Sequence, residues 1–562
     1  KRVWNQNQSG TPPTGYYYGT EYTNAEEIIA AKQDYAASHA THVTGIAAGA
    51  YKGNEYYGIA PDADLVFVSY NVSDNSSSNT SITDGIKYIY DYAESVGKPC
   101  VINMSLGYHI GPHDGTSTFD RICDELQGEG RLLVGASGNE AEYNIHATKT
   151  LKKGDTNMKS LVEFVSNWYL YGSMTSTVDI WGDAEKQLSA RVFVYDILNK
   201  KEVYSSESFS TTTSTSKKIS NPTGADGNIY ISTATNPYNK KGNITIDLNL
   251  SSFDNRNYYI GFEISGPEET TINAWTDAYM SWLSNFGNSE FTNGDNNSTM
   301  GEIGGTGKRI ITVGAYTSCN YIDHKNSSMW NNSGQTLNQL VSFSSLGPTA
   351  DGRMKPDITA PGSMLISSFN SSTSSNRNGE DYNYVVKQEN VNTVNYYYGS
   401  MEGTSMATPV VTGVLATWLQ ANPKLTPEQV REILSNTATT DSYTGNIAGV
   451  GNNRWGYGKI NAYDGLVYCL NHSGIEQIGT PTRPMVYPNP ATDICYFLLQ
   501  NDDKNVNVSI YTLNGTEIYS RYMGNINAGE QNQLDLSDLA AGIYFIHITG
   551  DKTNMTTKLT VK

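Results

Sequence analysis

Segments with strand-like and helix-like hydrophobic patterns alternate through the first quarter of the chain, and this alternation constrains the fold more than any other feature. Strand patterns occupy residues 63–70, 100–105 and 131–136, and helical patterns lie between them at residues 83–93 and 119–127. Strands joined through helices need crossover connections, which place them parallel in one sheet with helices on both faces. We therefore predict an α/β fold with its active site at the carboxyl ends of the strands.

The hydrophobic period changes to two between residues 147 and 295. Alternating apolar segments, separated by turns rich in Ser, Thr, Asn and Gly, occupy residues 189–195, 227–232, 243–248 and 258–264. This region predicts a jelly-roll-like β-sandwich that is inserted into the α/β domain. Such an insertion either braces the α/β domain, restricts its cleft or binds a surface, and we favour the brace.

The chain has 562 residues, more than one hydrophobic core usually serves, and its patterns divide it into five parts. These are the first part of the α/β domain (1–146), the inserted sandwich (147–295), the second part of the α/β domain (296–470), a linker (471–484) and a small all-β sandwich domain (485–562).

The composition excludes several classes of partner and cofactor. A net charge of −18 and a pI near 4.9 argue against nucleic acid or an anionic membrane as partner. No apolar stretch approaches the length of a membrane span. Five widely separated cysteines, without a CxxC pair or zinc spacing, indicate free thiols, and we expect no metal or other cofactor. Many tyrosines (40) and few charged residues (17%) are typical of a secreted protein.

Residues 403–409 read GTSMATP and lead directly into an apolar run rich in Ala and Val. This pattern predicts a buried helix with Ser405 in its first turn, among N–H groups that no helical carbonyl uses. Those groups and the positive end of the helix dipole favour an oxyanion beside the serine, so Ser405 is a candidate nucleophile. The alternative is that Thr404 or Ser405 simply caps a core helix.

A nucleophilic serine needs a base and an oxyanion donor, and two upstream segments offer them. Residues 38–49 read SHATHVTGIAAG and contain His39, and residues 134–139 read VGASGN and end in Asn139. With Ser405, and in this order, these segments resemble the subtilisin-like serine proteases, whose motifs read HGTHVAG, AxGN and GTSMAxP. Further segments fit the same family: GIAP at 58–61, NMSLG at 103–107, FSSLGP at 343–348, KPDITAPG at 355–362 and GYGKINA at 456–462.

The resemblance implies roles for individual residues. His39 is expected to be the general base and then the general acid, Ser405 the nucleophile and Asn139 the oxyanion donor. Two stretches at strand ends are expected to flank the substrate residue before the scissile bond and to pair with the peptide as an added strand. They comprise Ser105, Leu106, Gly107, Ala136, Ser137 and Gly138.

The surroundings of His39 carry further expectations. Ser38 is a suitable N-cap for the histidine helix. His42 is a structural neighbour, and the alternative of a His-x-x-His metal pair lacks a third ligand nearby. Ala40 replaces the glycine of the family motif. The loop at residues 49–57 is shorter than the calcium-binding loop of the family, so we expect no calcium there.

The third catalytic group of the family is an aspartate in a D-[ST]-G motif on an early strand, and residues 1–39 contain no such motif. Residues 3–31 resemble the segment that follows this strand in certain clostridial and bacteroidal subtilases, which places the aspartate upstream of Lys1. Asp34 lies five residues before His39 and can hardly reach the Nδ1–H side of its ring. It resembles instead an aspartate that lines the substrate cleft.

Residues 485–562 carry three short motifs of their own. They read YPNP at 487–490, LAAGIY at 539–544 and KLTVK at 558–562, and they resemble the C-terminal sorting domains of the type IX secretion system of Bacteroidota. The alternative is a generic carbohydrate-binding or immunoglobulin-like module.

Taken together, the resemblances predict a secreted or cell-surface serine endopeptidase that acts on peptide or protein substrates. Its expected partners are an upstream segment with the catalytic aspartate and the type IX secretion machinery. The alternative is a catalytically silent subtilase-fold surface protein that binds peptide or a partner.

Overall fold

The computed structural model describes residues 1–31, 38–51, 53–70, 78–165, 173–219, 226–251, 253–254, 256–277, 280–472, 485–499, 501–512 and 516–562. The chain forms two compact units, Lys1–Asn471 and His472–Lys562. All five cysteines are free thiols, as the sequence predicts. No helix within the described ranges is long and apolar enough to cross a membrane.

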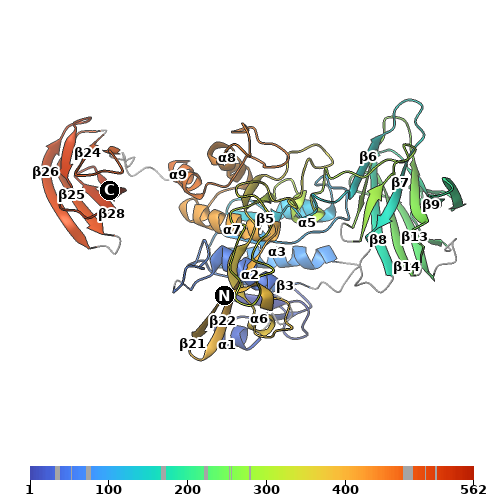
Figure 1. The fold of residues 1–562 in the computed structure, drawn as a ribbon, viewed down its shortest axis with the longest axis horizontal. Helices are drawn as coiled ribbons and strands as arrows, with labels where there is room; N and C mark the ends of the chain where they lie inside the picture. The colour runs from blue at the N-terminus through green and yellow to red at the C-terminus, as the bar shows by residue number, and fades with distance from the viewer. Residues whose placement is uncertain are drawn as a thin grey trace. The chain divides into compact units, whose positions relative to one another are not determined.

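A four-stranded parallel sheet organises the first unit (Figure 1). In spatial order its strands are β19 (Ile358–Pro361), β18 (Ile311–Tyr316), β5 (Arg131–Ala136) and β4 (Cys100–Met104). Successive side chains of β5 point to opposite faces, because Leu132 and Val134 join one hydrophobic cluster and Leu133 joins another. Both faces of the sheet are therefore buried, and the predicted α/β fold is confirmed.

Helices provide the cover on each face. α2 (His39–Ala48), α7 (Thr404–Ala421) and α8 (Pro427–Thr437) share the cluster of Leu132 and Val134. α3 (Ser78–Ser95) and α4 (Thr118–Leu126) share the cluster of Leu133. α7 is apolar on almost every side, and a helix of this kind is stable only when it is buried. It contacts all four strands, which fixes its first turn against the carboxyl edge of the sheet.

Shorter elements complete the part of the first unit that surrounds α7. The remaining helices are α1 (Ala25–Ala31), α5 (Glu302–Gly305), α6 (Ser371–Ser374), η1 (Tyr382–Tyr384) and α9 (Ala462–His472). An antiparallel sheet in the order β20 (Leu365–Phe369), β22 (Val394–Met401) and β21 (Val385–Val391) leads from β22 into α7.

A separate three-stranded sheet precedes α3 in the chain. Its order is β2 (Thr20–Tyr22), β1 (Arg2–Asn5) and β3 (Val66–Ser69), with β1 parallel to β3. α3 connects β3 to β4 and contacts both strands. Within the described ranges, however, β3 pairs only with β1 and β4 only with β5. Each of these strands therefore has an unpaired edge, although strands joined by one crossover helix commonly lie side by side.

The insertion consists of two six-stranded antiparallel sheets. One sheet contains β7 (Asn157–Phe164), β9 (Ser189–Asp196), β10 (Lys201–Ser205), β11 (Phe209–Ser210), β15 (Tyr258–Ser265) and β17 (Ser281–Ser284). The other contains β6 (His146–Thr150), β8 (Ser173–Ala184), β12 (Thr215–Ile219), β13 (Asp226–Thr235), β14 (Lys241–Ser251) and β16 (Thr271–Thr276).

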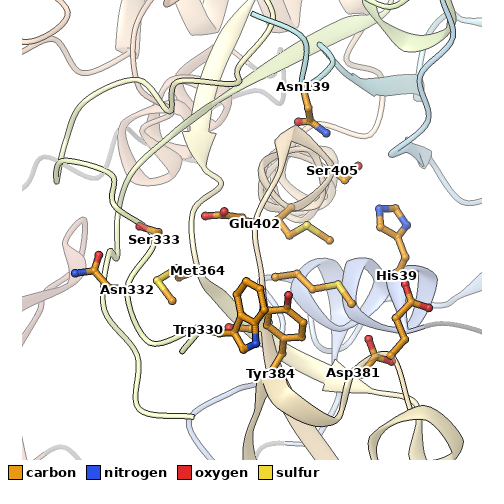
Figure 2. Close-up of a pocket in the computed structure, with 14 residues that line it drawn as sticks. His39, Asn139, Trp330, Asn332, Ser333, Met364, Asp381, Tyr384, Glu402 and Ser405 are labelled. Atoms are coloured by element: carbon orange, nitrogen blue, oxygen red, sulfur yellow. The ribbon is translucent and has the colours of Figure 1, made fainter. Parts of the chain in front are cut away.

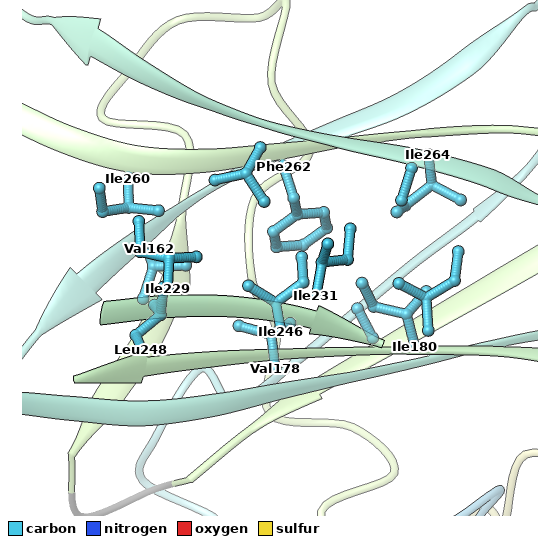
Figure 3. Packing of buried hydrophobic residues seen from close by; sticks show 14 of the residues in the cluster. Val162, Val178, Ile180, Ile229, Ile231, Ile246, Leu248, Ile260, Phe262 and Ile264 are labelled. Carbon is cyan, nitrogen blue, oxygen red and sulfur yellow. The ribbon is translucent and has the colours of Figure 1, made fainter. Parts of the chain in front are cut away.

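The two sheets face each other across one hydrophobic core, as Figure 3 shows. Val162, Ile260 and Phe262 come from one sheet, and Val178 and Ile246 come from the other. In β14 buried and less buried residues alternate along the strand, which is the period of two in the sequence. The predicted β-sandwich is confirmed.

The ends of the insertion are bonded to each other. His146 and Asp295 form an antiparallel bridge, with His146 N to Asp295 O at 3.3 Å and Asp295 N to His146 O at 2.6 Å. Their side chains also meet, with His146 Nδ1 lying 3.1 Å from Asp295 Oδ1. The chain therefore leaves and rejoins the α/β domain at one point.

The sandwich contacts the loop that follows β4. Trp275 stacks on His113 with 4.1 Å between ring centroids, and Lys241 Nζ lies 2.6 Å from Asp114. Asp179 accepts a hydrogen bond from the backbone N–H of Gly111 at 2.8 Å. The insertion is thus held against this loop by stacking, charge and hydrogen bonding together.

The second unit is a small all-β domain. One sheet contains β23 (Met485–Tyr487), β24 (Ile494–Leu498) and β27 (Asn532–Asp535). The other has the order β26 (Glu517–Ile526), β25 (Asp503–Thr512), β28 (Gly542–Thr549) and β29 (Asn554–Val561). Both contribute to one core, in which Phe497 from the first sheet and Val508 and Ile546 from the second are fully buried. The turn predicted at residues 513–515 lies outside the described residues.

Candidate active site

Ser405 is the second residue of α7, as predicted. The N-cap position is occupied by Gly403, and no side chain caps this helix. Gly403 has φ = 146°, a conformation that side chains with a Cβ rarely adopt. The interpretation of Thr404 or Ser405 as a simple helix cap is therefore wrong. The Ser405 N–H lies in the first turn, where no preceding helical carbonyl can accept from it.

The carbonyl of Ser405 has a partner outside the helix. Pro409 lies four residues further along α7 and has no N–H, so the usual helical bond to this carbonyl cannot form. Ser105 Oγ donates to the Ser405 oxygen instead, at 2.7 Å. Asn103 Nδ2 in turn donates to Ser105 Oγ at 3.0 Å, and Thr412 Oγ1 donates to Asn103 Oδ1 at 3.0 Å. These bonds fix the first turn of α7 to the end of β4.

The Asn139 side chain is held in one orientation. Its Oδ1 accepts from the backbone N–H of Thr404 at 2.9 Å and lies 3.0 Å from Thr404 Oγ1. Because the oxygen is engaged in this way, the amide nitrogen Nδ2 is the atom presented on the side of Ser405, as Figure 2 shows. An N–H donor is thus directed toward the predicted nucleophile before any substrate binds.

His39 is the first residue of α2, and its imidazole points toward Ser405 in Figure 2. Ser38 occupies the N-cap position, as predicted, and its carbonyl accepts from the backbone N–H of His42 at 2.8 Å, but its side chain makes no capping bond. The Ser38 hydroxyl donates instead to Asp381 Oδ2 at 2.6 Å and accepts from the backbone N–H of Asn370 at 2.7 Å. The start of α2 is therefore also anchored to the region around α6 and η1.

His42 lies one turn further along α2 and is fully buried. Its Nε2 lies 3.0 Å from the carbonyl oxygen of Leu365 and 3.1 Å from that of Gly399. Burial lowers the pKa of His42 to about 4, so the ring is neutral and donates from Nε2. This nitrogen is not available to a metal, and the residues described contain no group of three or more His, Cys, Asp or Glu that could hold one.

A cavity of about 530 Å³ opens beside these three residues. His39, Asn139 and Ser405 line it on one side (Figure 2). The remaining lining residues are Trp330, Asn332, Ser333, Met364, Glu380, Asp381, Tyr384, Ser400, Met401, Glu402 and Met406. A base, a nucleophile and an oriented amide donor thus meet at the border of a space that could hold part of a ligand.

Comparison with known proteins agrees with this geometry. The profile of the subtilase family matches residues 16–258 and 206–458, which together cover most of the chain. The chain belongs to the subtilase family. Residues 485–562 match the secretion system C-terminal sorting domain, so this subtilase is secreted or displayed at the cell surface.

Individual relatives match parts of the chain. The subtilase is 36% identical to serine protease AprX of Bacillus subtilis (strain 168) over 158 residues, 28% of this chain and 30% of the relative. It is 36% identical to minor extracellular protease Vpr of the same organism over 123 residues, 21% of this chain and 13% of the relative. The chain thus spans less than a third of the length of these curated relatives.

A solved structure shares the fold over a longer stretch. The CspB protease of Clostridium perfringens superposes with a TM-score of 0.57 at 20% identity, covering 81% of this chain and 87% of that structure. The similarity therefore extends well beyond the segments that contain His39, Asn139 and Ser405.

The two predicted substrate stretches of the subtilase leave adjacent strands. Ser105, Leu106 and Gly107 follow β4, and Gly107 is exposed with open space where a Cβ would lie. Ala136 ends β5, and the next two residues are already bonded within the protein. Ser137 N donates to Val313 O at 3.0 Å, Ser137 O accepts from Gly301 N at 3.0 Å, and Gly138 O accepts from Ser345 N at 3.0 Å. The backbone groups of Ser137 and Gly138 are therefore already hydrogen-bonded, whereas Gly107 has open space beside it. Substrate binding by the two stretches stays a prediction. 

The sequence motifs did not predict a role for Glu140, although its position directly after the predicted oxyanion donor Asn139 indicates that it lies near the site. It accepts from Ser345 Oγ at 2.8 Å and lies 3.5 Å from His109 Nε2. Burial alone would raise the pKa of Glu140, but the bond and charge of His109 and the bond from Ser345 outweigh it, so the pKa is lowered. His109 also stacks on His113, the residue against which Trp275 of the insertion packs.

Asp34 lies outside the described residues, and its predicted place at the cleft stays a prediction.

Proposed function

We propose that this subtilase is a serine endopeptidase that cleaves peptide bonds through an acyl-enzyme. Ser405 Oγ attacks the scissile carbonyl while His39 takes its proton, and His39 then gives this proton to the leaving amine. The Asn139 Nδ2 and the Ser405 N–H donate hydrogen bonds to the oxyanion that forms. Water repeats the sequence of proton transfers and releases the acyl group from Ser405.

The fixed orientation of the Asn139 amide is the observation that carries this proposal. Two contacts with Thr404 hold its oxygen away from the nucleophile, so the donor needs no reorientation when negative charge develops. A surface protein that only binds peptide has no need for an amide fixed in this way beside a histidine and a serine. The silent alternative is therefore less well supported.

The third catalytic group, we propose, is an aspartate on a strand N-terminal to Lys1. The unpaired edges of β3 and β4, joined through α3, offer a place for one further parallel strand. The carboxyl end of such a strand would lie beside the end of β4, where Ser105 contacts Ser405. A carboxylate there could orient His39 and stabilise its protonated form.

The C-terminal unit is proposed to address the enzyme to the type IX secretion machinery, which is the partner that a sorting domain of this kind serves. The substrates of the secreted enzyme are then peptides or proteins outside the cell.

Labelling with a fluorophosphonate probe tests the reaction directly. The probe should react with Ser405 of the full chain, because its phosphonyl oxygen occupies the oxyanion position and its phosphorus accepts the serine oxygen. Ser405→Ala should abolish labelling, and Ser435→Ala, at a half-buried serine of α8, is the matched control. Labelling that persists in Ser405→Ala would contradict the proposal.

A further inference from the structure

The position of the cavity beside His39 and Ser405 determines whether it binds the substrate residues before or after the scissile bond. Ser105 contacts the first turn of α7 from the side of β4, and residues 105–107 do not line the cavity. The cavity opens instead toward residues 330–333 and 380–384. Since His39 delivers a proton to the leaving amine, the residues after the scissile bond must lie next to this ring.

The walls of the cavity combine apolar surface with negative charge. Trp330 and Tyr384 form one wall, with 5.3 Å between their ring centroids, and Met364 and Met401 add aliphatic surface. The charged residues that line it are Glu380, Asp381 and Glu402, and no Lys or Arg side chain is among the lining residues described. A ligand that fills this space meets aromatic faces and carboxylates together.

The three carboxylates are not equally available to a ligand. Asp381 is buried and already accepts from Ser38 Oγ and Thr373 Oγ1. Glu402 is exposed, and among the described residues its carboxylate contacts Ser363 Oγ at 3.3 Å and no cation. Glu402, three residues before Ser405 in the sequence, therefore lacks a compensating positive charge in the described structure.

We propose that this cavity selects a lysine or arginine side chain on the leaving-group side of the scissile bond. The aliphatic stem of such a residue packs against Trp330 and Tyr384, and its cationic end reaches Glu402 and Glu380. Aromatic rings pack against the aliphatic stem of a Lys or Arg side chain, and their faces also attract its positive charge. The stem and the cationic end therefore both have partners in this cavity. This inference rests on the proposed function and adds the substrate class to it.

Paired fluorogenic peptides test the inference on the full chain. The peptides share one acyl half and carry Lys, Arg, Met or Glu at the first or second residue after the scissile bond. We expect kcat/KM for Lys and Arg to exceed that for Glu by roughly tenfold to a hundredfold, the range for a hydrogen bond to a charged group. The Met peptide should fall between them, because it keeps the aliphatic stem and lacks the charge.

Charge-removing variants identify the residues responsible. Glu402→Gln with Glu380→Gln should bring the Lys, Arg and Glu peptides to similar kcat/KM, and should change kcat/KM for the Met peptide less than kcat/KM for the Lys peptide. Glu428→Gln, which changes an exposed carboxylate paired with Arg309 on α8, should leave the preference unchanged. Equal cleavage of Lys and Glu peptides by the unaltered protein, or a preference that survives the double variant, would overturn the inference.

A binding measurement separates this inference from the proposed function. If no peptide is cleaved even when the segment that carries the proposed aspartate is present, the proposed function fails, and the cavity is then tested with labelled tetrapeptides that begin with Lys or Glu. Fluorescence anisotropy on Ser405→Ala should show binding of the Lys peptide that is about tenfold tighter. Equal binding of the two peptides would show that the cavity does not select a cation.

Discussion

Ser105 Oγ donates to the Ser405 carbonyl oxygen in place of the helical bond that Pro409 cannot supply. A side chain at the end of β4 thereby completes the hydrogen bonding of the first turn of α7. The position of the predicted nucleophile thus depends on an adjacent strand as well as on its own helix.

This relationship predicts a coupled pair of substitutions. Ser105→Ala should lower the free energy of unfolding by about 1–3 kcal/mol, because a buried carbonyl loses its partner. In a Pro409→Ala background the restored N–H can bond to the Ser405 carbonyl, so Ser105→Ala should cost less there. Urea unfolding of the four proteins measures the coupling, and additive effects would show that the two residues act independently.

Asn139 is predicted to act on turnover rather than on binding. Asn139→Ala should lower kcat by about 100- to 1000-fold with little change in KM, because the lost bond forms fully only in the transition state. Asn139→Asp keeps the acceptor for Thr404 but removes the N–H donor, so it should lose a similar factor. If only the alanine variant were impaired, Asn139 would be a structural turn residue.

Addition of the proposed strand N-terminal to Lys1 tests the third catalytic group. The unpaired edges of β3 and β4 should bind this strand, raising the melting temperature, and its aspartate should raise peptide hydrolysis by up to about four orders of magnitude. The same segment with this aspartate changed to asparagine should give the stability without the hydrolysis. Full serine-dependent hydrolysis by residues 1–562 alone would contradict the proposal.

The buried ion pairs around Asp357 predict a large loss of stability when that residue is removed. Asp357 Oδ2 lies 2.7 Å from Lys355 Nζ and its Oδ1 lies 2.7 Å from Arg431 Nε, beneath the sheet edge at β18 and β19. Asp357→Ala should cost about 3–5 kcal/mol, because it leaves two cations without their partner. Glu428→Ala, at an exposed pair, should cost at most about 1 kcal/mol. Similar losses in the two variants would contradict the prediction.

Asp120 predicts a specific dependence of stability on pH. Burial raises the pKa of Asp120 to about 7, despite the bond from Thr306 Oγ1, whereas an unfolded aspartate titrates near pH 3.8. Between these values the folded chain keeps a proton that the unfolded chain has lost, so this group makes stability fall as pH rises from about 4 to 7. Asp120→Asn should remove this component, measured by urea unfolding at several pH values. Burial and the nearby charge of Asp120 also raise the pKa of Glu302, which shares Thr306 Oγ1 with Asp120. An unchanged pH dependence would therefore place the retained proton on Glu302 instead of Asp120.

Local sequence determined the elements that carry the predicted catalytic residues. The apolar run after Ser405 predicted a buried helix, and the apolar pattern before Ser105 predicted a strand, and the structure has both as α7 and β4. The order of the three motifs then predicted that His39 and Asn139 lie at the same site as Ser405. Ser38 lies at the N-cap position as predicted, but capping statistics consider the helix alone and could not show that its hydroxyl donates to Asp381, more than three hundred residues away in the chain.

Residues that reach the site through tertiary contacts could not be predicted in this way. Trp330, Tyr384 and Glu402 lie on segments with no regular hydrophobic period, and tertiary contacts such as those of β20 with α2 and of α2 with α7 bring them to one cavity. The stacking of Trp275 on His113 likewise depends on how an inserted domain meets a loop far away in the chain.

The bridge between His146 and Asp295 bears on how such a protein could arise. The two ends of the sandwich are hydrogen-bonded neighbours, so the insertion joins the α/β domain at adjacent positions, as a short loop would. The entropic cost of closing the chain at this point is therefore small. A gene fragment that encodes the sandwich could therefore be gained, lost or exchanged at this point without rerouting the catalytic chain. The inserted domain is then free to diversify in evolution while the site that contains Ser405 is kept.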